Sequence, residues 1–270
     1  MKILFIALNS WRKDNSLGNS YSSIFGKMED VEIAHVFSSN KKPDYEKNIT
    51  RYFQIKEEDV IKSCFSFKRG NGVGREVTLD DFKEPNPSEK KENFYSHSLS
   101  FGKNHHWILL YWARDLAWRF GRINYKGLID FVNDFNPDII FFSFGNIFRS
   151  NRLALYIKKH TGLPLVVHMQ MDHYSLKRVS YNPLFWIDRF LKRAMIRRVA
   201  KQSEVFYCIS ERLKKELEHS LHVPCKVLYK IPDNERSVEP YKETHQPVRF
   251  LYTGNIGANR RKTLALLAHS

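Results

Sequence analysis

The sequence predicts an α/β protein built on a doubly wound, mostly parallel β-sheet. Short, continuous apolar runs bounded by polar residues recur along the chain, and such runs are typical of strands that a parallel sheet buries on both faces. Segments with helical spacing alternate with these runs, which is the order found in doubly wound sheets. Of the 270 residues, 42% are hydrophobic and 14% aromatic, which is enough to bury a sizeable core.

The N-terminal part of the chain predicts three strands. The apolar run 2–8 stops at a polar Asn-Ser pair and is the first strand. A polar, glycine-containing loop over 9–20 and a short helix near 21–28 should follow. The segments 32–37 and 49–55 are the second and third strands.

Residues 38–104 are expected to include a long mobile insertion. The stretch 56–104 is rich in Lys, Glu, Asn, Gly and Pro and has little periodicity. Within it, 70–74 reads Gly-Asn-Gly-Val-Gly and superficially resembles a phosphate-binding loop. It lacks the Gly-Lys-Ser/Thr ending of that motif, so we interpret it as a flexible loop tip.

Helices are predicted after residue 105. The first carries Trp107, Leu110, Tyr111 and Trp118 along one face. The second has apolar side chains at i, i+3, i+4 and i+7, namely Leu128, Phe131, Val132 and Phe135. An Asn-Pro pair at 136–137 should end this second helix.

A strict alternation follows that second helix. The predicted strands are 139–144, 164–169, 205–209 and 226–229. The predicted helices are 149–160, 183–201 and 211–220. Residues 230–247 have the composition of a linker, because three prolines stand there among polar residues. A further strand at 248–253 and a basic helix start at 260–262 then predict the opening of a second domain.

Charge and cysteine content restrict the partners and the compartment. Lys and Arg number 44 against 29 Asp and Glu, a net charge of +15, so an anionic partner is favoured: membrane lipid, a phosphorylated ligand or nucleic acid. No signature of a nucleic-acid-binding module is present, and we expect no nucleic acid partner. Three scattered cysteines and the lack of a signal peptide or long apolar run predict a cytoplasmic protein.

The stretch 177–201 predicts a basic amphipathic helix. Arg189, Arg193 and Arg197 repeat every four residues on one face. The expected apolar stripe is Leu184, Ile187, Leu191 and Ala194. Two interpretations stay open. The arginine face docks on an anionic membrane surface, or it is the solvated side of a helix that covers the sheet.

Polar residues gather after the strand at 164–169. His168 lies near the end of this strand, and Asp172 and His173 follow it. Because parallel sheets bind ligands beyond the carboxyl ends of their strands, Asp172 and His173 are candidates for the mouth of a ligand cleft. His168 is better explained as a core histidine. Three such residues at a strand end do not fix a metal-ligand geometry, so we expect no metal site.

Several segments together resemble a known enzyme family. Residues 136–140 have a Pro-Asp-apolar-apolar strand start, and 162–172 have a Gly-x-Pro-x-Val strand followed by a His/Asp pair. An apolar strand followed by Ser-Glu-x-Leu occupies 205–213, and a strand, glycine loop and basic residues occupy 250–262. With Gly18 after the first strand, their order and spacing resemble a retaining glycosyltransferase of the GT-B fold, family 4 type.

The resemblance implies two Rossmann-like domains with a cleft between them. Residues 1–246 would be the N-terminal domain, which binds the acceptor. Residues 247–270 would be the beginning of a truncated C-terminal domain, which holds the nucleotide sugar in this family. The enzyme would move a sugar from a nucleoside diphosphate sugar to a surface-glycan or lipid-linked acceptor, with retention, at the cytoplasmic membrane face.

The resemblance also assigns residues to this reaction. Asp172 and His173 would line the reaction centre. The donor diphosphate would be bound by five residues: Gly18, Asn19, Gly254, Arg261 and Lys262. Basic side chains would neutralise the leaving group, so neither a metal nor another cofactor is expected.

The chain departs from the family pattern in three places. Asn255 stands where many members have Arg after the glycine. Residues 231–234 replace the usual Asn-Gly after the last strand of the first domain. The family's paired-glutamate segment would lie beyond residue 270, so we expect this chain to lack most of the donor site. A second hypothesis therefore stays open, a non-catalytic module that docks on anionic membrane or acidic saccharide through the basic helix 177–201.

Overall fold

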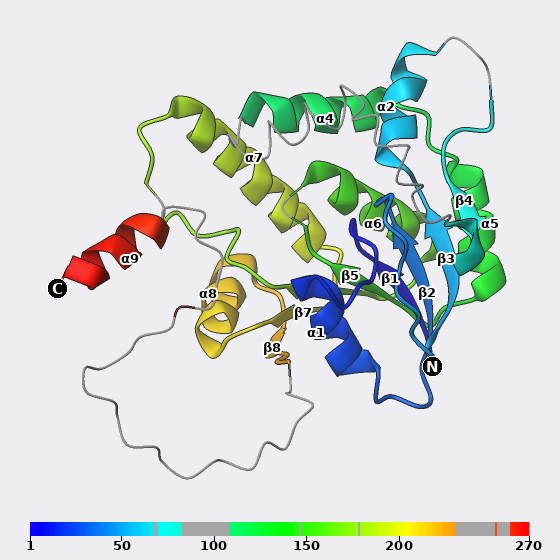
Figure 1. Cartoon of the computed structure of the whole chain (residues 1–270), viewed down its shortest axis with the longest axis horizontal. Coiled ribbons are helices and arrows are strands. Elements are labelled where there is room, and N and C mark those ends of the chain that lie inside the picture. Colours follow the sequence, from blue (N-terminus) through cyan, green and yellow to red (C-terminus); the bar gives the residue numbers. More distant parts are fainter. Residues whose placement is uncertain are drawn as a thin grey trace. The chain divides into compact units, whose positions relative to one another are not determined.

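The computed structural model describes residues 1–66, 70–82, 108–145, 147–177, 179–230, 252 and 260–269 (Figure 1). The chain divides into two compact units, Met1–Ile231 and Pro232–Ser270. The boundary expected at 246/247 stays a prediction.

The first unit is built on an eight-stranded, mostly parallel sheet with the order β4-β3-β2-β1-β5-β6-β7-β8. Neighbouring strands are parallel except β4, which runs antiparallel to β3. The strands are β1 Lys2–Ile6, β2 Glu32–Phe37, β3 Ile49–Gln54, β4 Arg75–Val77, β5 Ile139–Ser143, β6 Leu165–Met169, β7 Val205–Cys208 and β8 Cys225–Val227. The predicted fold class is confirmed.

The chain winds outward from β1 in both directions. It moves from β1 through β2 to β3, then returns to the other side of β1 and continues from β5 to β8. The strand order therefore reverses between β1 and β5. In open parallel sheets, the carboxyl ends of the strands at such a reversal form the usual ligand crevice.

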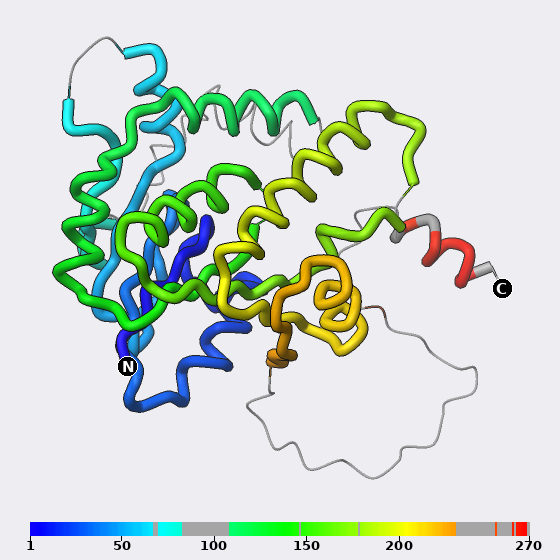
Figure 2. The backbone as a smooth tube through the Cα atoms, turned by 180° about the vertical axis from the view of Figure 1, so that it is seen from behind, coloured from blue at the N-terminus to red at the C-terminus, as the bar shows by residue number. Residues whose placement is uncertain are grey.

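Helices cover the two faces of the sheet unequally (Figures 1 and 2). Helix α1 (Ser16–Phe25) packs on one face with Phe5, Trp11 and Phe141. The opposite face carries α2 Glu57–Phe65, α4 Ile108–Phe120, α5 Tyr125–Phe135, α6 Phe148–Thr161, α7 Pro183–Ala200 and α8 Glu211–Leu221. The helices that follow β5, β6 and β7 lie on the same face. Right-handed crossovers require this when successive strands are added on the same side of the sheet.

Helix α5 matches its prediction closely. All four residues of the predicted apolar stripe are buried: Leu128, Phe131, Val132 and Phe135. Asn136 ends the helix in the left-handed conformation with φ 51°. Asparagine adopts this conformation more readily than most residues other than glycine. Gly162 ends α6 in the same way with φ 72°, where a Cβ atom would be strained.

Helix α1 begins earlier than predicted. It starts at Ser16 rather than near Tyr21, because the side chain of Asn15 caps it. The Asn15 Oδ1 accepts the N–H of Gly18 at 2.8 Å. The segment expected to be a loop up to residue 20 is therefore partly the first turn of this helix.

The long mobile insertion expected within 38–104 stays a prediction, although the described parts of this segment form regular structure. Besides β3, the segment contains α2, β4 and a short 3₁₀ helix at Leu79–Asp81. Helix α2 buries only Val60 among its nine residues. Three acidic residues in its first turn suit the positive end of a helix dipole instead. Residues 83–104 lie outside the described residues.

Helix α7 has the predicted length but a different orientation. Its sheet-facing residues are Ile196, Val199 and Ala200 near the C-terminal end. Ile187 and Leu191 belong to the expected apolar stripe, yet they are 49% and 47% exposed. The apolar stripe therefore lies on the outer side of α7.

The structure describes two parts of the second unit, Tyr252 and helix α9 (Arg260–His269). The linker after Lys230 and the predicted strand at 248–253, apart from Tyr252, lie outside the described residues. Among the helices described, none combines the length and the apolar content that crossing a bilayer requires.

Candidate functional site

The carboxyl edge of the sheet brings two of the predicted site segments to one side of the first unit. Gly18 and Asn19 lie in the first turns of α1, after β1. Asp172 and His173 lie in the loop after β6. Because β1, β5 and β6 are parallel, both segments emerge from the same edge, around the reversal between β1 and β5.

Asp172 is an ionised turn residue. Its Oδ1 accepts the backbone N–H groups of Tyr174 at 3.0 Å and Ser175 at 2.8 Å. Burial opposes ionisation, but the hydrogen bonds from Ser175 and Tyr174 and the nearby Arg189 outweigh it, so the pKa lies below its usual value. Asp172 therefore offers a negative charge at the sheet edge.

His173 is neutral near pH 7. Burial, reinforced by the positive charges of Arg189 and Lys192, lowers its pKa to about 4. Its ring centroid lies 5.9 Å from that of Phe144, which follows β5. A neutral imidazole beside a carboxylate can donate and accept hydrogen bonds to a hydroxyl group without changing its charge.

Three arginines of α7 hold the loop that carries these two residues. The Arg193 guanidinium stacks 3.9 Å from the ring centroid of Tyr174 and donates to its carbonyl oxygen. The Arg197 Nε donates to the Tyr174 hydroxyl at 2.8 Å, and the Arg189 Nε donates to the Ser175 carbonyl at 2.8 Å. The predicted membrane contact of these arginines stays a prediction, but their positions show a different task, which is to fix the loop after β6.

A hollow of about 570 Å³ lies beside this loop. Its wall includes Asp172 and Arg193, together with Leu213, Glu216 and Leu217 of α8. Lys177 forms an ion pair with Glu216 at its rim. The volume lies within the range of small-molecule sites, and apolar walls with a few charged groups are usual there.

Gly18 and Asn19 already have partners within the protein. A Cβ atom on Gly18 would lie 2.1 Å from the carbonyl oxygen of Arg12, so a glycine is required for packing. Its N–H is held by Asn15. The Asn19 Oδ1 accepts a hydrogen bond from the Lys230 Nζ at 2.7 Å. Lys230 thus brings a positive charge to the start of α1, and sequence reasoning missed it because 211 residues separate it from Asn19.

A buried polar group beneath the crevice was also missed. The Tyr21 hydroxyl lies 2.9 Å from the Ser143 Oγ and 2.8 Å from the His168 Nδ1. Burial lowers the pKa of His168 to about 4, so it is a neutral core histidine, as expected. Its Nε2 is buried without a partner among the described residues. The group joins α1, β5 and β6 below the candidate site.

A second missed cluster joins three helices. Glu57 of α2 forms a bidentate ion pair with Arg114 of α4 at 2.7 and 2.8 Å. Arg149 of α6 lies 3.4 Å from Glu57 and 3.8 Å from Asp115. Burial raises the pKa of Asp115 despite Arg149 beside it. No local pattern could reveal this cluster, because its members come from distant segments.

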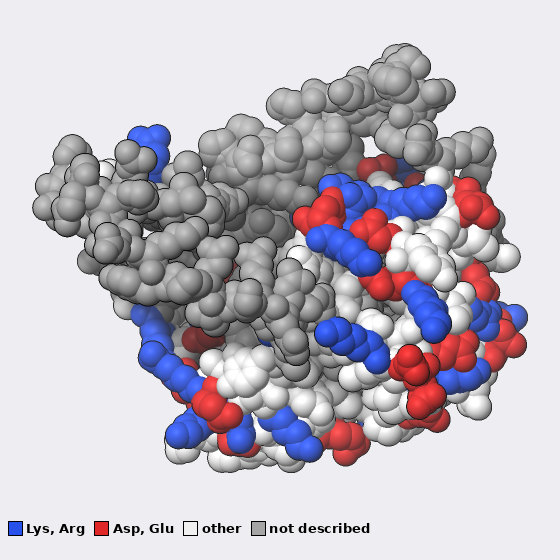
Figure 3. Space-filling view, turned by 60° about the horizontal axis from the view of Figure 1, so that its bottom comes forward, with Lys and Arg blue, Asp and Glu red and all other residues white. Residues whose placement is uncertain are grey.

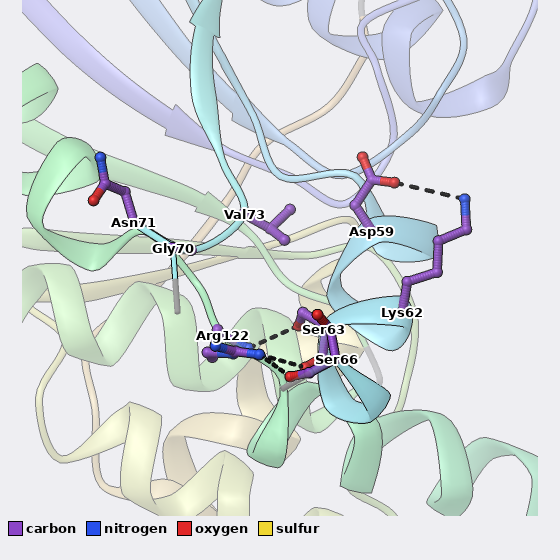
Figure 4. Close-up of a pocket in the computed structure, with 9 residues that line it drawn as sticks. Asp59, Lys62, Ser63, Ser66, Gly70, Asn71, Val73 and Arg122 are labelled. Carbon is purple, nitrogen blue, oxygen red and sulfur yellow. Dashed lines mark hydrogen bonds and ion pairs between the residues drawn. The ribbon is translucent and has the colours of Figure 1, made fainter. Parts of the chain in front are cut away.

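A smaller hollow of about 280 Å³ lies between α2 and the loop at 70–73 (Figure 4). Arg122 donates hydrogen bonds to Ser63 and to the carbonyl oxygen of Ser66 at the end of α2. The glycine loop is tied to the segment before α5, since the N–H of Val73 donates to the carbonyl of Arg122 at 2.8 Å. Gly72 and Gly74 have positive φ angles, which the tight path of this loop requires.

The remaining predicted donor residues belong to the second unit. Gly254 lies outside the described residues, as does the side chain of Lys262. Arg261 is exposed in the first turn of α9. Their part in donor binding stays a prediction.

The surface charge is mixed on the face that Figure 3 turns to the viewer, where basic and acidic side chains alternate. Among the described residues, no three side chains of His, Cys, Asp or Glu gather as a metal site would require. The candidate site consists of the Asp172 carboxylate, the neutral His173 imidazole and the loop after β6 that the arginines of α7 hold.

Comparison with known proteins gives structural likeness alone. No family model and no curated protein matches the chain. Similar solved structures are of glycosyltransferases with the GT-B fold. Phytolacca americana UGT2, complexed with UDP-2-fluoro-glucose and pterostilbene, aligns with a TM-score of 0.45 and 5% identity over 87% of this chain and 55% of that one.

Two further structures align at a similar level. Glycyrrhiza uralensis UGT73P12, complexed with glycyrrhetinic acid 3-O-monoglucuronide, has a TM-score of 0.44 and 11% identity over 84% of this chain and 48% of its own. Sucrose-phosphate synthase from Thermosynechococcus elongatus has a TM-score of 0.43 and 6% identity over 84% of this chain and 47% of its own. The chain spans about half the length of these proteins. With TM-scores below 0.5, the likenesses do not decide what this chain does.

Proposed function

We propose that the chain forms the acceptor-binding part of a retaining glycosyltransferase, similar to family 4 of the GT-B fold. The reaction transfers a hexose from a nucleoside diphosphate sugar to a surface-glycan or lipid-linked acceptor, in polysaccharide biosynthesis at the cytoplasmic face of a membrane. The proposal rests on the motifs at 136–140, 162–172 and 205–213, each of which accompanies a described strand, β5, β6 or β7.

The observation that carries the proposal is the position of the two polar segments. The segments after β1 and β6 emerge at one edge of the sheet, around the reversal of strand order. This is where open parallel sheets bind their ligands. The hollow beside Asp172 adds a space of suitable size for part of an acceptor.

The roles of the residues follow from their chemistry. The carboxylate of Asp172 can accept a hydrogen bond from an acceptor hydroxyl, and the neutral ring of His173 can orient that hydroxyl. In the proposed enzyme, Asn19 and Lys230 border the cleft near the donor phosphates, since Lys230 brings a cation to the start of α1. Arg261 and Lys262 contribute further positive charge to the leaving group.

Turnover by the full-length product of the gene tests the proposal. The protein is incubated with UDP- and GDP-sugars and with glycan or lipid-linked acceptors, and release of the nucleoside diphosphate is measured. We expect transfer with retention of the anomeric configuration, which NMR of the product reports. Asp172→Asn should lower kcat/KM by at least about tenfold, because it removes a charge at the reaction centre.

Asp30→Asn is the matched control, since it makes the same change at an exposed carboxylate just before β2, at the opposite edge of the sheet. It should leave kcat/KM within about twofold of the native value. Calorimetry that finds no nucleotide sugar bound by either the 270-residue chain or the full gene product would overturn the proposal.

A further inference from the structure

The outer side of α4 carries an uncovered apolar stripe. Leu109, Ala113, Leu116 and Phe120 recur at i, i+4, i+7 and i+11, and all are exposed. Leu116 is 54% and Phe120 67% exposed. The opposite side of the same helix makes its contacts within the protein, through Arg114 with Glu57 and through Asp115 with Arg149.

Helix α7 carries a similar stripe. Ile187, Leu191 and Ala194 follow the same spacing on its outer side, and Phe190, beside them, is 56% exposed. Tyr181, just before the helix, is fully exposed. The opposite side of α7 holds the loop after β6 and packs Ile196 into the core.

The two stripes belong to neighbouring helices. Figures 1 and 2 show α4 beside the N-terminal half of α7, and the Trp112 Nε1 donates to the Asp188 Oδ1 at 3.0 Å between them. Both helices contact α6 with their inner sides. We call the exposed apolar residues of both helices the outer face: Leu109, Leu116, Phe120, Tyr181, Ile187, Phe190 and Leu191.

The exposed charged side chains of α4 and α7 have one sign. Each helix has a single acidic residue, and both are turned inward: Asp115 toward Arg149, and Asp188 toward Trp112 and Lys192. The exposed charges are basic. Arg119 lies beside the α4 stripe, and Arg198 continues the α7 stripe one turn further.

We propose that the outer face of α4 and α7 docks the protein on the surface of an anionic lipid bilayer. Apolar and aromatic side chains framed by cations, without exposed carboxylates on the two helices, are the combination that inserts between headgroups and is attracted by anionic lipid. The net charge of +15 favours the same partner. The contact differs from the predicted one, because Arg189 and Arg193 hold a loop, while the apolar side chains face outward.

A second copy of the chain fits this face less well. A symmetric dimer would place the same patch on itself. Arg119 and Arg198 would then approach the cations of the other copy, and neither helix offers an exposed carboxylate to neutralise them. An anionic bilayer supplies the missing negative charge along with an apolar interior.

Vesicle co-sedimentation tests this docking with the 270-residue chain. Vesicles of phosphatidylcholine are compared with vesicles containing equal parts of phosphatidylglycerol, in low and high salt. The test variant is Leu116→Glu with Phe190→Glu. The matched control is Met28→Glu with Tyr45→Glu, which replaces two other exposed apolar residues and makes the same change in net charge.

The native chain and the control should bind the anionic vesicles, and salt should weaken this binding. The test variant should bind at least about tenfold less, because each glutamate stays outside the headgroup region. All four side chains are exposed, so the urea midpoints of both variants should stay near the native one.

Three results would overturn the docking proposal: no binding of the native chain to anionic vesicles, equal binding by test and control variants, or a native dimer that only the test variant dissociates. The proposal extends the proposed function by naming the membrane surface, yet it does not require sugar transfer. Vesicle binding and nucleotide-sugar turnover are measured separately, so the failure of one is distinguishable from the failure of the other.

Discussion

Helices α5 and α7 have similar sequence patterns and opposite outcomes. Both begin at an asparagine cap, and both carry apolar side chains at helical spacing. The stripe of α5 is buried against the sheet, whereas most of the stripe of α7 faces solvent. Periodicity therefore identifies an apolar face, but it does not show what covers that face. In α7 the inner side holds a loop through arginines over most of its length, and only its C-terminal end packs apolar residues into the core.

The largest expected difference between the two helices is in how much one phenylalanine contributes to the free energy of unfolding. Phe131 of α5 is buried and its ring centroid lies 5.3 Å from that of Phe53. Phe131→Ala should lower the free energy of unfolding by about 3–5 kcal/mol, since it leaves a cavity. Phe190→Ala on α7 should change it by no more than about 0.5 kcal/mol. Urea denaturation measures both, and comparable losses would contradict the assignment of the outer face.

The second expected effect concerns the arginines of α7. Arg193→Ala removes the stacking on Tyr174 and a hydrogen bond to its carbonyl, and it should cost about 1.5–3 kcal/mol of unfolding free energy. Arg198→Ala, at an exposed position of the same helix, should cost less than about 0.5 kcal/mol. Thermal denaturation compares them. If both arginines cost equally little, the loop after β6 does not depend on this clamp.

Much of the fold could be predicted from sequence. The strands are buried on both faces, so their apolar runs are continuous, and β2 was predicted to the residue at Glu32–Phe37. The end signals of α5 and α6 could be predicted because Asn136 and Gly162 act locally. Helix α2 could not be predicted in this way, because it is held by ion pairs with distant helices rather than by an apolar stripe.

The candidate site could be predicted only in part. Asp172 and His173 follow a strand, and the rule for parallel sheets places them at an edge. Their environment was unpredictable, since Arg189 and Arg193 come from the next helix and their inward orientation depends on Tyr174. Gly18 has a structural reason that its local sequence does not reveal, while its predicted role in donor binding stays a prediction. The backbone of Arg12 approaches so closely that only glycine fits at this position.

A third prediction uses the histidine held beside α7. The buried stripe of α5 contains no titratable side chain, whereas α7 places Arg189 and Lys192 near His173, whose pKa burial lowers to about 4. The unfolded chain takes up this proton near pH 6.5, so the folded state loses stability as the pH falls from about 6.5 toward 4. Between these values, His173 should contribute a slope of up to about 1.4 kcal/mol per pH unit.

Urea denaturation as a function of pH measures this slope. His173→Gln should remove the contribution of His173 to this slope. The free energy of unfolding of the variant should therefore fall less steeply with decreasing pH than that of the native chain. The other buried histidines, His35 and His168, keep their own contributions in both proteins, because burial lowers their pKa values as well. Identical slopes for the variant and the native chain would show that His173 titrates alike in the folded and unfolded states.

The smallest expected effect compares the two asparagine caps. Asn124 caps α5 by accepting the N–H of Gly127 at 2.9 Å, and its Nδ2 also donates to the Gly74 carbonyl at 3.1 Å. Asn182 caps α7 by accepting the N–H of Leu184 at 3.0 Å. Asn124→Ala should therefore cost about 1–2 kcal/mol and Asn182→Ala about 0.5–1 kcal/mol of unfolding free energy. Hydrogen exchange should place the loosened amides of the first variant in both α5 and the 70–74 loop, and those of the second in the first turn of α7 alone. A larger loss at Asn182 than at Asn124 would mean that the exposed start of α7 is more firmly built into the fold than its outer face suggests.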